Sequence, residues 1–161
     1  MNKALRHYEE SVLIPASPRD LFSYIDDHKS FSSHMSKSSW MMGGGKMEVS
    51  VDEGNGRKAG SHIRLKGTAL GIKLYLDEVI TRYEPPLLKT WETVGIPKLL
   101  VISQYGMGIE IKPQNTSSLL RVFIDYDLPT IHTWLGQLFS GFYAKWCVRQ
   151  MLKGVSIHFT K

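Results

Sequence analysis

Polar and apolar residues alternate with a period of two over most of the middle of the chain. Ile63 and Leu65 fall on one face of such a segment, and His62, Arg64 and Lys66 fall on the other. This alternation is typical of strands with one buried face, and turn residues such as Gly, Asn and Pro separate the segments. The strands that we predict cover residues 47–51, 60–69, 72–84, 88–94, 99–111 and 119–128. Because only short turns join them, they should form an antiparallel meander.

The beginning of the chain predicts a strand followed by short helices. A partly β-branched run over His7–Ile14 indicates an opening strand. Ser17 is suited to cap a helix with Pro18 in its first turn, and the apolar spacing that follows predicts a helix over Pro18–Asp26. A second short helix is predicted over His28–Met35.

The end of the chain changes to helical spacing. Large apolar residues recur at intervals of three and four between Pro129 and Phe159, which predicts one long helix. Upstream, the apolar parity shifts near Asp77–Glu78, which predicts a β-bulge that bends the sheet. Together these elements indicate an α+β fold, a single domain over residues 1–161. In this fold a curved antiparallel sheet wraps the long C-terminal helix and leaves an apolar cavity between them.

Length and composition are those of an ordinary globular domain. The 161 residues include 42% hydrophobic side chains and a single cysteine, Cys147, so no internal disulfide can form. The opening residues lack the apolar run of a secretory signal, and no stretch reaches the ~18 uncharged apolar residues of a membrane span. The expected location is therefore the cytoplasm.

The charge pattern argues against a nucleic-acid partner. The net charge of +5 comes from 20 Lys and Arg against 15 Asp and Glu. These charges are scattered, without the basic stripe and interleaved aromatic residues of a nucleic-acid interface. One apolar turn, Ile96–Leu100, carries a cation at Lys98 and is a candidate for transient contact with an anionic membrane surface.

No catalytic residue, metal site or cofactor is predicted from the residue types. The histidines do not pair at the helical spacing that holds a metal ion, and Cys147 lies among apolar residues, where a lone cysteine acts as a small hydrophobic side chain. Of the neighbours Trp91 and Glu92 only one can face inward, and we predict Trp91 because burying an unpaired carboxylate is costly. The strand residues that could perform acid–base chemistry, if they face the cavity, are Glu78, Glu92, Tyr75 and Tyr105.

Three segments carry a resemblance to a known family. Val12–Phe22 resembles the opening strand and helix start of the START-like (SRPBCC) superfamily. Val79–Leu88 resembles the mid-sheet strand of this superfamily with its Pro-containing turn. Tyr126–Pro129 resembles the segment in which its last strand leads into the long helix. The order of elements is similar from about His7 to the C-terminus. Lipid-transfer START domains, pollen-allergen-like binders and polyketide cyclase/dehydrase-type proteins share this helix-grip fold. The resemblance implies an elongated pocket between the sheet and the long helix, and it does not fix a substrate.

The function predicted from these features is binding or carriage of a small hydrophobic molecule, such as a lipid, polyketide or isoprenoid. The expected pocket is lined by Met41, Met47, Ile63, Leu65, Leu74, Trp91, Tyr105, Leu135, Leu138 and Phe142. Two alternatives stay open: a polyketide cyclase/dehydratase-type enzyme using the same cavity, and a protein- or membrane-interaction module without a small ligand. Two or more ionisable side chains facing the cavity would favour the enzyme. Ligand identity and oligomeric state stay open, as does whether segment 30–47 gates the pocket or covers the core.

Overall fold

The computed structural model describes residues 6–27, 47–69, 72–98, 102–128 and 133–160. Within them the chain forms a seven-stranded sheet and two helices. The bounds of these elements are β1 Arg6–Ile14, α1 Pro18–Asp26, β2 Met47–Val51, β3 His62–Ala69, β4 Ile72–Glu84, β5 Leu88–Lys98, β6 Tyr105–Gln114, β7 Ser117–Tyr126 and α3 Thr133–Thr160. The predicted helix over His28–Met35 lies outside the described residues.

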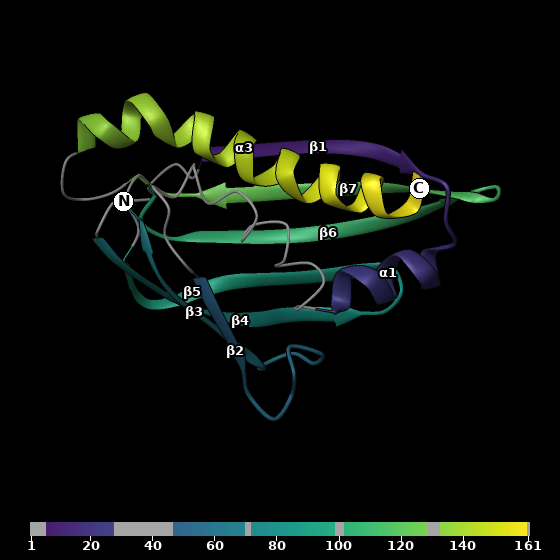
Figure 1. The fold of residues 1–161 in the computed structure, drawn as a ribbon, viewed down its shortest axis with the longest axis horizontal. Coiled ribbons are helices and arrows are strands. Elements are labelled where there is room, and N and C mark those ends of the chain that lie inside the picture. Colours follow the sequence, from purple (N-terminus) through teal and green to yellow (C-terminus); the bar gives the residue numbers. More distant parts are fainter. Residues whose placement is uncertain (1–5, 28–46, 70–71, 99–101, 129–132, 161) are drawn as a thin grey trace.

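The sheet is an antiparallel meander with the first strand of the chain added at one edge. The strand order is β1-β7-β6-β5-β4-β3-β2, and every neighbouring pair is antiparallel. Strands β2 to β7 therefore follow one another in space as predicted, and β1 pairs with β7 at the far edge. The sheet is curved, and α3 lies along β1 and β7 on its concave side (Figure 1). The predicted α+β architecture is confirmed.

The hydrophobic core lies where α1 and the C-terminal half of α3 meet β6 and β7. Alternate residues of β7, among them Leu120 and Val122, are almost completely buried, as a strand with one inward face requires. From α3, Val148 and Val155 enter the same cluster. Tyr24 of α1 stacks on His158 near the end of α3, which joins the two helices directly.

A buried ion pair ties the end of α1 to the sheet. Lys89 of β5 is 2% exposed, and its Nζ donates a hydrogen bond of 2.7 Å to Oδ1 of Asp26. The Tyr83 hydroxyl donates to the other carboxylate oxygen of Asp26 at 2.6 Å. Burial lowers the pKa of Lys89, and the hydrogen bond from its ammonium to Asp26 acts in the opposite direction. The carboxylate thus compensates a cation that has little access to water.

Two predicted strand boundaries differ clearly from the structure, at the end of β5 and at the start of β6. The sequence predicted a turn at Gly95–Lys98, but the strand continues to Lys98, which pairs with Tyr75 of β4. Gly95 has a φ of 73°, in the left-handed region that glycine adopts easily. The glycine that suggested a turn therefore allows a local irregularity within the strand. Strand β6 begins at Tyr105, later than the predicted start.

The bulge predicted in β4 appears as two register shifts. They fall between Tyr75 and Asp77 and between Ile80 and Arg82, on either side of Glu78. Glu78 itself is buried, whereas Asp77 lies on the opposite face, 2.9 Å from His62 Nδ1. The strand therefore bends around a carboxylate that it turns towards the concave side.

Candidate functional site

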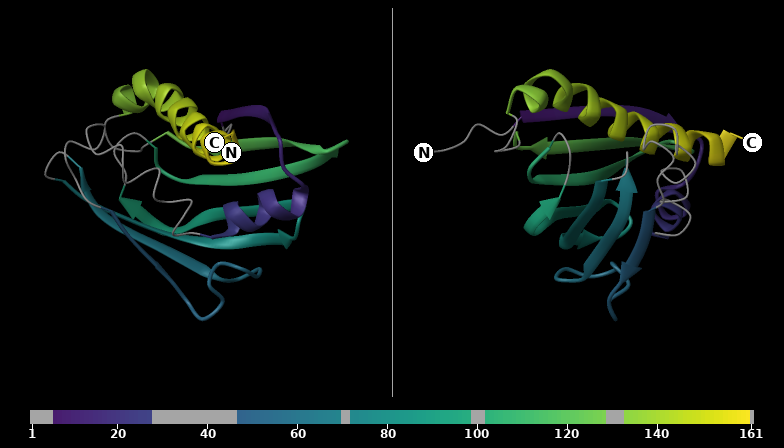
Figure 2. Two further views of the ribbon diagram at one scale, coloured as in Figure 1. Left: turned by 45° about the vertical axis from the view of Figure 1, so that its right-hand side comes forward. Right: turned by 60° about the vertical axis from the view of Figure 1, so that its left-hand side comes forward.

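The concave side of the sheet is only partly covered by α3. The helix packs chiefly on β1 and β7, so the strands at the other end of the sheet curve away from it (Figure 2). Inward residues there are incompletely buried: Val49 is 36% exposed and Val51 is 40% exposed. We call this region the open inner face, and it consists of Val49, Val51, Leu65, Leu74, Trp91 and Tyr105.

The strand register fixes the direction of these side chains. Val51 pairs with Ile63, and Ile63 pairs with Glu78, so these three positions share one face of the sheet. Ile63 and Glu78 are each only 7% exposed. The open inner face therefore surrounds a carboxylate that lies deeper than its apolar neighbours.

Glu78 interacts with side chains from two adjacent strands. The Tyr105 hydroxyl of β6 donates to Oε1 of Glu78 at 3.0 Å. Trp91 of β5 also favours the charged form of the carboxylate. Both partners come from the open inner face. The carboxyl group is thus fixed in position although it lies in largely apolar surroundings.

Burial raises the pKa of Glu78 to about 7. The Tyr105 hydrogen bond, the positive charge of Lys89 and the Trp91 side chain lower the pKa, and the Asp77 charge raises it, but removal from water dominates. A carboxyl group with this pKa exists in both protonation states near neutral pH, which makes it able to accept or donate a proton there.

Two polar groups of the long helix interact electrostatically with Glu78. Tyr143 and Cys147 sit one helical turn apart on α3, and the charge of Glu78 is the smallest of the causes that act on the pKa of each. Cys147 raises the pKa of Tyr143, and Tyr143 acts to lower the pKa of Cys147. Burial raises the pKa of Cys147 to about 12, so the thiol stays protonated near neutral pH and is a poor nucleophile.

The two tyrosines are expected to act as hydrogen-bond donors. Burial raises the pKa of Tyr105 well above its ordinary value, and the interaction with Cys147, followed by burial, does the same for Tyr143. Both hydroxyls therefore remain protonated under physiological conditions. We call the set Glu78, Tyr105, Trp91, Tyr143 and Cys147 the Glu78 cluster.

The predicted lining residues on the sheet lie on the concave side. Ile63 is buried, and Leu65, Leu74, Trp91 and Tyr105 are half-buried. Trp91 packs against the core while Glu92 is exposed, which confirms the predicted choice between these two neighbours. Whether these residues contact a ligand stays a prediction. Met41 lies outside the described residues, and so do the side chains of Met47 in β2 and Leu135 in α3.

Two of the predicted helix residues are largely exposed, and whether they contact a ligand stays a prediction. Leu138 is 67% exposed and Phe142 is 65% exposed, so their side chains do not form a packed wall against the sheet. The packed side of α3 instead carries Ala144, Val148 and Val155. Because α3 has apolar residues around its whole circumference, the size of a side chain does not indicate which side faces the sheet.

The sequence interpretation found part of the Glu78 cluster and missed the rest. It named Glu78 and Tyr105 as acid–base candidates, but it did not connect Tyr143 or Cys147 with them. The only available signal was the spacing of four residues between Tyr143 and Cys147, which places both on one side of a helix. Of the other candidates, Glu92 is exposed, and Tyr75 has the parity of outward-facing Asp77.

The described residues contain neither a group of metal ligands nor a membrane-spanning helix. Among residues that the structure describes, no group of three or more His, Cys, Asp or Glu side chains converges as metal ligands. None of the described helices combines the length and the apolar character needed to cross a membrane.

The family to which the chain belongs follows from comparison with known protein families. Residues 6–156 match the family described as polyketide cyclase / dehydrase and lipid transport. The chain belongs to this family. The resemblance to the START-like (SRPBCC) superfamily is therefore confirmed. A comparison with curated proteins found no significant match.

Solved structures share the fold of the family at low sequence identity. Truncated norcoclaurine synthase from Thalictrum flavum is 12% identical, with a TM-score of 0.68, over 100% of this chain and 99% of that chain. Ara h 8.0201 is 13% identical, with a TM-score of 0.66, over 97% and 98%. The di-domain ARO/CYC protein BexL of the BE-7585A biosynthetic pathway is 12% identical, with a TM-score of 0.70, over 98% of this chain and 50% of BexL. At these identities the likeness shows the helix-grip fold and no particular activity.

Proposed function

We propose that the protein binds a small hydrophobic ligand between the open inner face and α3, with one polar group of the ligand at the Glu78 cluster. The observation that carries this proposal is a set of inward apolar side chains that keep exposed surface around a buried, hydrogen-bonded carboxyl group. Ligand sites commonly combine apolar walls with a few fixed polar groups in this way. The family, which includes lipid transport proteins, supports the same function.

The cluster narrows the chemistry of the ligand. The Tyr143 hydroxyl can donate a hydrogen bond, and Glu78 can accept one when ionised or donate one when neutral. An oxygen-bearing group such as a carbonyl or hydroxyl at one end of an apolar body would satisfy these partners. Lipids, polyketides and oxygenated isoprenoids all have this form. On the composition of the chain, we propose the cytoplasm as the place of action.

The test is binding of a neutral fluorescent probe, N-phenyl-1-naphthylamine, and its displacement by long-chain alcohols and ketones. Wild-type protein should bind the probe at micromolar concentration. Leu65→Asp should lose most of the binding, because a carboxylate would enter the apolar wall. Leu13→Asp is the matched control, since Leu13 is 54% exposed on β1.

A third variant separates this site from the one first predicted. Leu138→Asp should keep the affinity of wild type for the probe, because Leu138 is exposed on α3. Circular dichroism verifies the folding of each variant. Absence of probe binding by wild type, or equal binding by folded Leu65→Asp, would contradict the proposed site.

A second candidate function is acid–base catalysis on the bound ligand. It is favoured by the pKa of about 7 at Glu78 and by the tyrosine hydroxyl that holds its carboxyl group. Ionised Glu78 would remove a proton from a carbon next to a carbonyl, and the resulting oxyanion would accept a hydrogen bond from Tyr143. The proton then returns from the carboxylic acid to the carbon, so the step needs no cofactor.

Deuterium exchange separates catalysis from binding. A long-chain β-keto ester in deuterated buffer should exchange its acidic carbon-bound hydrogen faster with wild type than with Glu78→Gln, as followed by NMR. The rate should rise with pH through about 7, because the base must be ionised. Equal exchange rates for the two proteins, with the probe bound by both, would leave binding as the function.

A further inference from the structure

A second apolar surface lies on the first half of α3, at the open end of the concave side. Large hydrophobic side chains there are more than half or nearly half exposed, although the same helix is firmly packed farther along. The residues are Trp134 at 59%, Leu138 at 67%, Phe139 at 49% and Phe142 at 65%. We call them the aromatic face of α3. Contiguous exposed apolar residues of this size on a soluble fold mark an interaction surface.

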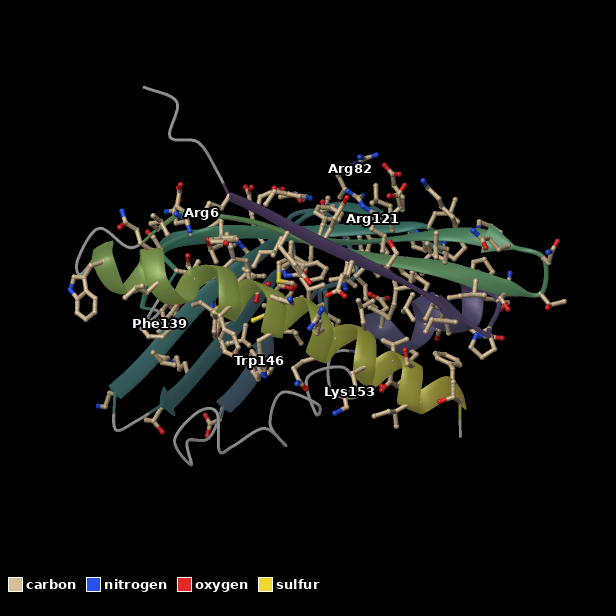
Figure 3. The ribbon with its side chains drawn as sticks, turned by 90° about the horizontal axis from the view of Figure 1, so that it is seen from above. Arg6, Arg82, Arg121, Phe139, Trp146 and Lys153 are labelled. Carbon is tan, nitrogen blue, oxygen red and sulfur yellow. The ribbon has the colours of Figure 1, made fainter. Side chains whose placement is uncertain are left out.

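The helical spacing joins these residues into one band. Trp134, Leu138 and Phe142 follow one another at intervals of one turn. Phe139 and half-buried Trp146, which are seven residues apart from each other, extend this band. Phe139, Trp146 and Lys153 project from the side of α3 that faces away from β1 (Figure 3). The apolar band therefore leads into a cation on the same side of the helix.

The charge of α3 has one sign. Residues 133–160 contain Lys145, Arg149 and Lys153 and no Asp or Glu. Arg149 is engaged by Glu10 of β1, at 2.9 Å, whereas the exposed ammonium of Lys153 forms no salt bridge with a described residue. The whole chain carries a net charge of +5. The helix thus presents exposed aromatic residues next to cations and carries no carboxylates. Such a helix complements an interface with an apolar interior and an anionic outer layer.

We propose that the aromatic face of α3 docks on an anionic lipid bilayer, with the helix lying in the plane of the interface. Aromatic side chains enter the boundary between headgroups and acyl chains, and the lysines face the anionic headgroups. A second copy of the chain fits this surface less well, because a twofold contact would bring cations of the two helices together. The proposal does not depend on the proposed ligand site. It also moves the expected membrane contact from the Ile96–Leu100 segment, whose side chains are not described, to α3.

Co-sedimentation with vesicles tests the proposal. Wild-type protein should pellet with vesicles of phosphatidylcholine and phosphatidylglycerol in equal parts, and much less with phosphatidylcholine alone. High salt should weaken the association, because the attraction of exposed cations is screened over about 10 Å at 0.1 M. The tryptophan emission should shift to shorter wavelength on binding, and Trp134→Phe should reduce this shift while still pelleting.

Two variants locate the contact. Phe142→Glu should lower the apparent affinity for the anionic vesicles by about ten-fold or more, since it removes an apolar anchor and adds a repelled charge. Leu87→Glu is the matched control, because Leu87 is 45% exposed in the turn between β4 and β5, and it should bind like wild type. Unchanged binding of N-phenyl-1-naphthylamine by Phe142→Glu distinguishes this contact from the ligand site.

Three results would overturn the proposal. The first is wild-type protein that remains in the supernatant with anionic vesicles. The second is an equal loss of vesicle binding in Phe142→Glu and Leu87→Glu. The third is a dimer seen by analytical ultracentrifugation that dissociates in Phe142→Glu, because the aromatic face would then be covered by a second copy.

Discussion

The two ends of the concave side differ in how completely they are filled. At the packed end, α1 and the C-terminal half of α3 bury aliphatic side chains such as Leu21, Leu120 and Val148 to the point of full exclusion from water. At the open end, Val49, Val51 and the aromatic face of α3 keep much of their surface exposed. The same sheet and the same helix contribute to both ends.

This difference indicates that one end of the domain contributes chiefly to stability and the other chiefly to binding. Interiors filled at crystal-like density stabilise a fold but leave no room for a ligand. The packed end therefore provides the stability that allows the open end to retain exposed apolar surface and a carboxyl group with a raised pKa. Substitutions at the packed end should therefore change stability, and those at the open end should change binding or pH dependence.

The largest effect is expected from breaking the buried ion pair at the end of α1. Asp26→Ala would leave Lys89 without the carboxylate that now lies 2.7 Å from its Nζ, at a cost of about 3–5 kcal/mol in the free energy of unfolding. The exposed pair of Arg82 and Glu84 is the control, and Arg82→Ala should cost less than about 1 kcal/mol. Urea unfolding measures both. Similar losses would show that burial does not distinguish the pairs.

A smaller effect is expected from truncating aliphatic side chains at the two ends. Leu120→Ala should lower the free energy of unfolding by about 2–5 kcal/mol, because Leu120 is fully buried and its removal leaves a cavity. Val49→Ala should cost less than about 1 kcal/mol, since Val49 is 36% exposed. Thermal and urea unfolding provide the comparison. A cost at Val49 equal to that at Leu120 would remove the distinction between the two ends.

The smallest effect depends on pH and concerns Glu78. Its pKa in the folded state, about 7, is higher than its ordinary value of 4.5, so folding takes up a proton between these values. Wild-type stability should therefore fall as the pH rises through this window, by at most about 3 kcal/mol. Glu78→Gln removes the ionisation, so its stability relative to wild type should increase between about pH 5 and pH 8. Glu92→Gln is the matched control, because the Glu92 side chain is exposed. A constant difference between wild type and Glu78→Gln would contradict the raised pKa.

The architecture could be predicted because each strand carries its own evidence. Alternation in β3 separated Ile63 from His62, and the cap at Ser17 fixed the start of α1, where the Ser17 side chain accepts a hydrogen bond from the Asp20 amide at 3.2 Å. The long helix was also correctly predicted to exist. Local patterns of this kind depend on the covalent neighbours of a residue, which the sequence contains in full.

The site was harder to predict because it depends on how elements rotate against one another. The apolar residues of α3 surround the helix, so spacing did not show that Tyr143 and Cys147 interact electrostatically with Glu78 while Leu138 and Phe142 are exposed. The position of Glu78 depends on two register shifts in β4, and a shift of one residue moves a side chain to the other face of a sheet. Such rotations follow from packing across the whole domain.

The pairing of β1 with β7 has a consequence for the way the chain acquires its structure. Ser118 donates a hydrogen bond to the carbonyl of Ala16 across 102 positions, and Arg121 bonds Glu9 across 112. During synthesis this edge of the sheet cannot form until β7 has left the ribosome. Strand β1 and helix α1 therefore stay without their packing partners β7 and α3 until the end of translation. Contacts at such separations also slow spontaneous folding. We expect folding to be completed only after synthesis, with the first strand joining late and the unfinished chain open to proteases and chaperones at its N-terminal end.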